Sequence, residues 1–192
     1  MGRPPTFERD EVIDKAMDLF WRQGYRATTP NDLVDTLGIG KGSLYHAFGS
    51  KRELFSLALD RYRDQQAVLI DRALAEPGPI KDRIIAAMRL IIELNTTDAD
   101  RRGCLAVNTA AELATVDEDA GERVSAMFER TTGAFTDAIR AGQASGELRT
   151  DLDADAVALH LLTTLVGLQV LTRTTLDPER LARSVEVAVA AL

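Results

Sequence analysis

Apolar residues recur every three or four positions along most of the chain, which is the spacing that places them on one face of an α-helix. The first such stretch covers about residues 8–23, with Val12, Ala16 and Phe20 among its apolar positions. The alternation of apolar and polar residues that is typical of β-strands is missing, and residues with high helix propensity dominate. The pattern predicts an all-α protein with about nine helices.

Three short helices are predicted at the start of the chain, separated by residues that stop helices. Gly24 ends the first, because glycine accepts the left-handed backbone of a helix C-terminus. Thr29 is a good N-cap and Pro30 suits the first helical position, so the second helix is predicted over about 30–37. A Gly-Ile-Gly turn then leads to a third helix over about 41–48.

Mostly longer helices are predicted after these three. Ser50 is a suitable N-cap for a helix over about 51–75, and Glu53 is placed to complete a capping box with it. The Pro-Gly-Pro run at 77–79 stops this helix. Further helices are predicted over about 80–95, 104–114, 119–145, 154–173 and from 178 to the end of the chain. This layout indicates a small N-terminal unit followed by a larger helical one.

The third short helix has an apolar side and a polar side, as a DNA recognition helix requires. Leu44 and Phe48 are four residues apart and are expected to face the core. A pair of short helices joined by a glycine turn is also common as an αα-hairpin in a core, so this pattern alone leaves both interpretations open. The side opposite Leu44 carries groups that reach base edges or phosphate: Lys41, Gly42, Tyr45 and His46.

The net charge of −7 at first argues against binding to nucleic acid. Residues 1–55 hold eight basic and eight acidic residues, whereas residues 56–192 hold fifteen and twenty-two, which accounts for the whole −7. Between 38 and 52 there are three basic residues and no acidic one. Because DNA affinity depends on local phosphate contacts, the N-terminal unit remains a candidate, and the acidic remainder would help to orient it.

A longer motif supports DNA binding. The run from Thr28 to Leu54, TTPNDLVDTLGIGKGSLYHAFGSKREL, resembles the helix-turn-helix of TetR-type regulators. The residues Leu19-Phe20 and Gly24-Tyr25 are also similar to that family's pattern. The motif covers about residues 10–55, and the nine-helix layout extends a weaker resemblance over the whole chain. The Gly-Lys-Gly-Ser-Leu-Tyr run favours a DNA-binding unit over a plain helix pair.

The resemblance implies specific DNA contacts. It implies that Thr29 and Lys51 touch phosphate, and that the start of the third helix approaches the major groove with Tyr45 on the backbone. Where the family often has His directly before the Phe, this chain has Ala47, so a phosphate contact by His46 does not follow. An arm at Arg3-Pro4-Pro5 is either a minor-groove contact or a frayed end. The predicted DNA-binding residues are Thr28, Thr29, Lys41, Gly42, Ser43, Tyr45, His46 and Lys51.

Cys104 is the one cysteine of the chain, which excludes an internal disulfide and a cysteine-based zinc site. It is either a small packing residue or a reactive thiol, because Arg101, Arg102 and a helix N-terminus would stabilise the thiolate. The Gly103-Cys104-Leu105 run is similar to a segment of some TetR-type regulators in which a cysteine senses electrophiles or oxidants. Both interpretations stay open.

The middle helices are apolar on one face and either enclose a pocket or form a plain core. The family resemblance favours a pocket for a small apolar effector. Trp21 and Tyr25 are expected to pack rather than read bases, and His160 is expected to be buried or at an interface. The candidate effector-binding or sensing residues are Met88, Cys104, Asn108 and Phe128.

The last two predicted helices carry apolar residues over a broad surface, with small residues such as Thr164 and Gly167 that allow close approach. In TetR-type proteins, the last two long helices of each subunit form a four-helix dimer interface. A two-fold homodimer would place its recognition helices about 34–36 Å apart, one turn of DNA. The operator is then expected to be an approximate palindrome.

Other functional classes lack their signatures. The chain has no phosphate loop, HExxH or GxSxG motif, so no enzyme activity, metal or cofactor is expected. It has neither a signal peptide nor about 18 consecutive apolar residues, so a cytoplasmic protein is expected. We predict a DNA-binding domain over 1–50 and an effector-binding and dimerisation domain over 51–192. The predicted function is a TetR-type repressor released by an effector; the alternative is a helical ligand-binding protein without DNA binding.

Overall fold

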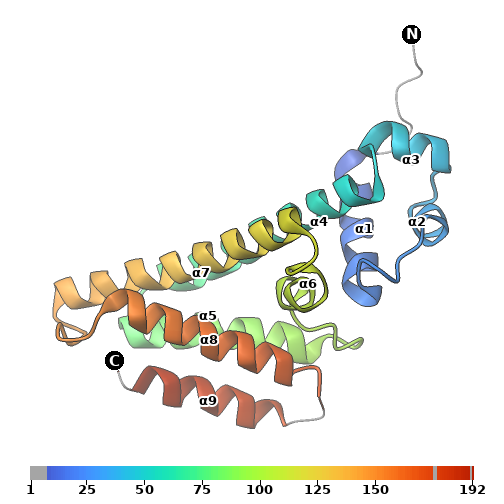
Figure 1. Cartoon of the computed structure of the whole chain (residues 1–192). Helices are drawn as coiled ribbons and strands as arrows, with labels where there is room; N and C mark the ends of the chain where they lie inside the picture. Colours follow the sequence, from blue (N-terminus) through green and yellow to red (C-terminus); the bar gives the residue numbers. More distant parts are fainter. Residues whose placement is uncertain (1–7, 175–176, 191) are drawn as a thin grey trace.

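The computed structural model describes residues 8–174, 177–190 and 192, and these form nine α-helices and no strand (Figure 1). The all-α prediction is confirmed, and predicted and observed boundaries differ by no more than two residues. The predicted arm at 3–5 lies outside the described residues. The helices are α1 (Arg9–Gln23), α2 (Pro30–Leu37), α3 (Lys41–Phe48), α4 (Lys51–Ala75), α5 (Ile80–Thr97), α6 (Leu105–Leu113), α7 (Glu118–Ser145), α8 (Ala154–Leu171) and α9 (Pro178–Ala190).

Side-chain N-caps start α2 and α4. Thr29 accepts a hydrogen bond from the Asp32 amide, and the Asp32 carboxylate accepts one from the Thr29 amide, so a full capping box starts α2. The capping box predicted at Ser50 is only half right: Ser50 accepts from the Glu53 amide, but its own amide donates to the Phe48 carbonyl. Gly49, with φ of 74°, turns the chain so that this amide points backwards.

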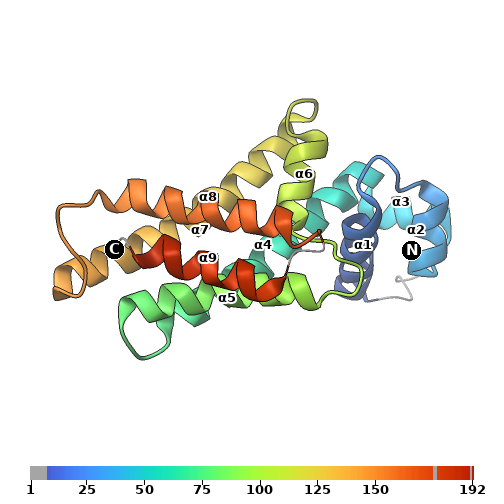
Figure 2. The ribbon, with the colours of Figure 1, turned by 90° about the horizontal axis from the view of Figure 1, so that it is seen from below.

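The helices form an elongated molecule with α1, α2 and α3 at one end (Figure 1). α4 begins beside α3 and runs into the rest of the molecule, where α7 packs along it. α5, α8 and α9 lie farther from the small N-terminal unit, with α8 and α9 next to each other when seen from below (Figure 2). α4 therefore belongs to both parts of the protein.

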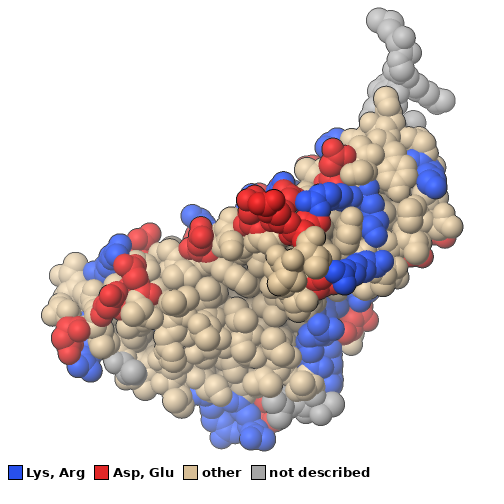
Figure 3. Space-filling view, viewed as in Figure 1, with Lys and Arg blue, Asp and Glu red and all other residues tan. Residues whose placement is uncertain are grey.

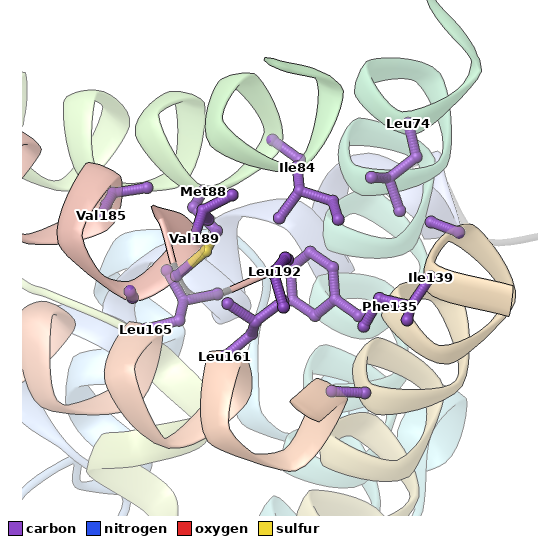
Figure 4. Packing of buried hydrophobic residues seen from close by; sticks show 14 of the residues in the cluster. Leu74, Ile84, Met88, Phe135, Ile139, Leu161, Leu165, Val185, Val189 and Leu192 are labelled. Atoms are coloured by element: carbon purple, nitrogen blue, oxygen red, sulfur yellow. The ribbon is translucent and has the colours of Figure 1, made fainter. Parts of the chain in front are cut away.

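Two apolar cores correspond to these parts. The far core joins α4, α5, α7, α8 and α9, with Met88, Phe135, Leu161 and Val185 among its buried residues (Figure 4). The near core joins α1, α2 and α3 to the first half of α4 and also includes residues of α6 and α7. The small N-terminal unit is therefore packed directly against α6.

Candidate DNA-binding face and regulatory sites

The two sides of α3 differ as predicted. Leu44 and Phe48 are buried, with 1% and 4% of their surface exposed, and they anchor the helix in the near core. Tyr45 is half-buried. The residues on the outer side that are exposed to solvent are Lys41, Gly42, Ser43 and His46.

Glycine residues shape the approach to α3. Gly38 caps α2 in the left-handed conformation, with φ of 66°, and Gly40 precedes the first residue of α3. Gly42 has a different role, because a Cβ atom added there would meet nothing within 4 Å. The fold of the free subunit does not need glycine at this position.

Two neighbouring threonines have opposite orientations. Thr29 is exposed at the start of α2, where it forms the capping box. Thr28 is completely buried, and its hydroxyl donates to the Gly24 carbonyl at 2.7 Å. The Thr28 side chain therefore closes the loop between α1 and α2 from inside, and this predicted DNA-binding residue does not lie on the outer face.

Lys51 is also held from within the protein. Its ammonium donates to the Tyr25 and Thr28 carbonyls, both at 2.7 Å, and lies 4.2 Å from the centre of the Tyr25 ring. Burial lowers the pKa of Lys51 from its ordinary value, while the nearby Glu112 carboxylate acts in the opposite direction. Lys51 thus stabilises the loop between α1 and α2 through these hydrogen bonds. The sequence pattern did not indicate this role.

Other cations near α3 are paired with residues distant in sequence. Arg52 forms ion pairs with Asp117 and Asp119 at the start of α7, more than sixty positions further along the chain. Arg9 donates to the Ala47 carbonyl at 2.9 Å and lies 4.8 Å from the centre of the Phe48 ring. Only the folded chain brings these partners together, so the local charge count overstated the free positive charge.

The packing predicted for Trp21 and Tyr25 is confirmed. The Trp21 ring lies 5.0 Å from the Tyr62 ring, and its indole N–H donates to the Gly103 carbonyl at 3.0 Å. The Tyr25 ring lies 4.8 Å from the Phe55 ring. These aromatic contacts fasten the C-terminal end of α1 to α4 and to the loop before α6.

Cys104 lies inside the protein with 6% of its surface exposed. The Tyr62 hydroxyl donates to its sulfur at 3.4 Å, and burial raises the pKa of the thiol despite its place at the start of α6. The adjacent cavity is small, about 30 Å³, and is lined by Tyr62, Ile91, Cys104, Phe128, Leu165 and Gln169 among others. A protonated, buried thiol favours the packing interpretation over the sensing one.

The four candidate effector residues do not meet at one place. Phe128 joins Cys104 at the small cavity. Met88 is fully buried in the far core (Figure 4). Asn108 lines a wider cavity of about 430 Å³ where α1 meets α6 and α8, and it bonds to the Arg102 carbonyl and to Arg173.

The state of Cys104 yields a prediction about thiol chemistry. At pH 8, we expect iodoacetamide to react with the native thiol about a hundredfold more slowly than with the unfolded chain. The thiol of the unfolded chain ionises near its ordinary pKa of 9.0, whereas burial keeps the thiol of the folded chain protonated at that pH. The free energy of unfolding should therefore fall as the pH rises above about 9. Mass spectrometry of alkylation and urea unfolding at several pH values measure both effects. Equal alkylation rates in native and unfolded protein would contradict the burial.

α8 and α9 have an outer surface that this subunit does not cover. Most of the apolar residues predicted there, such as Leu161 and Leu165, are buried in the far core, but Leu159 and Val187 expose 56% and 76% of their surface. His160 is exposed on α8, so the buried alternative predicted for it is wrong. The face over α8 is almost free of charge in Figure 3. By length and composition alone, α8 among the described helices is also apolar enough to cross a membrane.

Two features together are those of a helix-turn-helix regulator. A glycine-linked helix pair has an outward polar face, and this pair packs against a larger helical body with an uncovered apolar side. Residues 12–58 match the family model for bacterial regulatory proteins of the tetR family, and residues 80–188 match that for a tetracyclin repressor-like C-terminal domain. The chain therefore belongs to the TetR family.

Individual relatives agree with this assignment. The HTH-type transcriptional repressor ComR of Escherichia coli is 32% identical, over 94% of this chain and 86% of its own length. The uncharacterized HTH-type regulator YezE of Bacillus subtilis is 28% identical over the full length of both chains. A cysteine-substituted form of the TetR family regulator CifR, solved with 26-base-pair operator DNA, is 33% identical with a TM-score of 0.90, covering 99% of each chain.

Proposed function

We propose that this protein is a transcriptional repressor that binds a palindromic operator as a homodimer. The observation that carries the proposal is the outer side of α3, where Lys41, Ser43 and His46 are exposed beside a half-buried Tyr45 while Leu44 and Phe48 anchor the helix. These groups suit phosphate and base edges in the major groove. The open space around Gly42 lets the DNA backbone approach.

The dimer is proposed to form through the outer faces of α8 and α9. Apolar side chains this exposed on neighbouring helices are typical of a protein interface. The same use explains why α8 is so apolar without a membrane role, and it places His160 near the partner subunit. We propose DNA-binding and regulatory domains over 1–50 and 51–192, a cytoplasmic location, and no enzymatic activity or cofactor.

Release from DNA is proposed to follow binding of a small apolar effector. The cavity beside Tyr62, Cys104 and Phe128 lies between α4, α5, α6, α7 and α8, and these include the middle helices α5, α6 and α7 that were expected to enclose such a molecule. Its small volume requires these helices to move apart when an effector enters. The buried thiol gives no support to an electrophile sensor in the native state.

Operator binding in a salt series tests the proposal against the alternative of a helical ligand-binding protein without DNA binding. With palindromic DNA from the promoter next to its gene, we expect the logarithm of affinity to fall linearly with the logarithm of salt concentration. Electrophoretic mobility shifts measure this, and a scrambled duplex of equal length is the control. Equal affinity for both duplexes, or no binding at low salt, would contradict the proposed function.

A further inference from the structure

Glu112 joins α6 to the loop between α1 and α2. Its carboxylate accepts hydrogen bonds from the backbone amides of Tyr25 and Arg26, at 3.0 and 2.6 Å. Two successive amides bound to one carboxylate define both the position and the direction of this loop. The contact comes from the regulatory part of the chain and acts on a segment of the DNA-binding unit.

Gly24 makes room for this contact. Its φ of 82° is in the left-handed region, and a Cβ atom added there would lie 2.9 Å from a Glu112 carboxylate oxygen. Glycine thus suits this position twice, because it accepts the left-handed backbone and because a larger residue would require the carboxylate to shift.

The contact of Glu112 has both unfavourable and favourable electrostatic contributions. The Glu112 carboxylate lies at the C-terminal end of α1, where the helix dipole disfavours negative charge. The two amides and the attraction of Lys51 offset this cost. Lys51 donates to the carbonyls of Tyr25 and Thr28, so α4 binds carbonyl groups of the loop and α6 binds its amides.

The loop leads directly to the candidate DNA-binding face. It ends at Thr29, which caps α2, and α2 packs against α3. We infer that Glu112 is a positioning residue: it touches no DNA, but it sets where α2 begins and therefore how α2 and α3 meet the operator.

α6 also reaches the small cavity at its other end. Cys104, the N-cap of α6, and Ala106 both line that cavity. Glu112 follows Cys104 by eight residues, about 12 Å along a helix. An effector that displaces the Cys104 end of α6 would draw Glu112 from the loop and weaken operator binding. This step rests on the proposed function, whereas the contact between Glu112 and the loop does not.

Variants of Glu112 test the inference. In Glu112→Ala, we expect hydrogen exchange of the Tyr25 and Arg26 amides to become at least about tenfold faster, because both lose their acceptor. Operator affinity should fall about tenfold, with the dimer unchanged. Glu112→Gln keeps one acceptor oxygen and should give intermediate values. The readouts are exchange followed by NMR, mobility shifts and size-exclusion chromatography.

Two comparisons separate positioning from a merely structural role. Alanine is a better helix former than glutamate, so if Glu112 served only the helix, Glu112→Ala would leave affinity and exchange unchanged. Glu122→Ala, at an exposed position of α7, is the matched control and should behave like the native protein. Native affinity in Glu112→Ala would overturn the inference. If the native protein bound no operator, the proposed function would be overturned instead. The hydrogen-exchange data would still show whether Glu112 protects the amides of Tyr25 and Arg26.

Gly24→Ala supplies an independent check, because its added methyl group would displace the Glu112 carboxylate. We expect weaker operator binding in this variant. In the double variant with Glu112→Ala, the steric part of the effect disappears, so the loss of affinity should be smaller than the sum of the losses in the two single variants. Full additivity in mobility shifts would show that the residues act separately and would count against the inference.

Discussion

Replacing Tyr45 by alanine is expected to weaken operator binding by at least about thirtyfold while the dimer stays intact. Each subunit presents one copy of α3, so a contact of about 1–3 kcal/mol is lost twice, about 2–6 kcal/mol in total. Tyr45 is half-buried and lies beside the core rather than in it, so the fold should survive. Mobility shifts measure the affinity, and size-exclusion chromatography measures the dimer.

The neighbouring residue provides the contrast for this experiment. Leu44 is 1% exposed, and Leu44→Ala should lower the free energy of unfolding by about 2–5 kcal/mol, because it empties a core position. Thermal unfolding distinguishes the two variants. If Tyr45→Ala lost stability as Leu44→Ala does, or lost the dimer, α3 would have a structural role and the assignment of its outer face would be wrong.

The double variant Leu159→Glu, Val187→Glu is expected to raise the dissociation constant of the dimer at least about a thousandfold. A two-fold interface contains each charge twice, and burying an unpaired carboxylate costs several kcal/mol. Both side chains are exposed in the isolated subunit, so helix content should not change. Analytical ultracentrifugation measures the dissociation, and operator binding should fall with it because half-sites would be bound singly.

Val116→Glu is the matched control for the interface. Val116 exposes 65% of its surface in the turn between α6 and α7, outside α8 and α9. The same change of an exposed valine to glutamate should leave dimer and operator binding unaffected there. A native dimer in the double variant would show that the subunits meet through another face.

The sequence predicted α2 and α3 to the residue because their boundaries depend on local signals. Thr29, Pro30 and the glycines at 38 and 40 act within one turn of the helices that they bound. The outward side of α3 followed from four-residue spacing for the same reason. Local patterns therefore sufficed for the helices and for the exposed side of α3.

The parts that the sequence could not predict depend on contacts between distant segments. Lys51 looked like a phosphate ligand, but its ammonium binds carbonyls of a loop more than twenty positions earlier. Glu112 gave no signal, because its partners are backbone amides and backbone amides have no sequence signature. The charges near Arg101 and Arg102 suggested a reactive Cys104, whereas desolvation, a property of the packed core, decides its pKa.

The continuity of α4 restricts how such regulators can be recombined. A chimaera cut at residue 50 would separate the N-terminal unit from Leu54, Phe55 and Ala58, which belong to its own core. The exchange point would have to lie beyond Tyr62, and the new body would still need to supply an acceptor for the amides of Tyr25 and Arg26. Operator specificity therefore cannot be transferred to another regulatory domain by exchanging residues 1–50 alone.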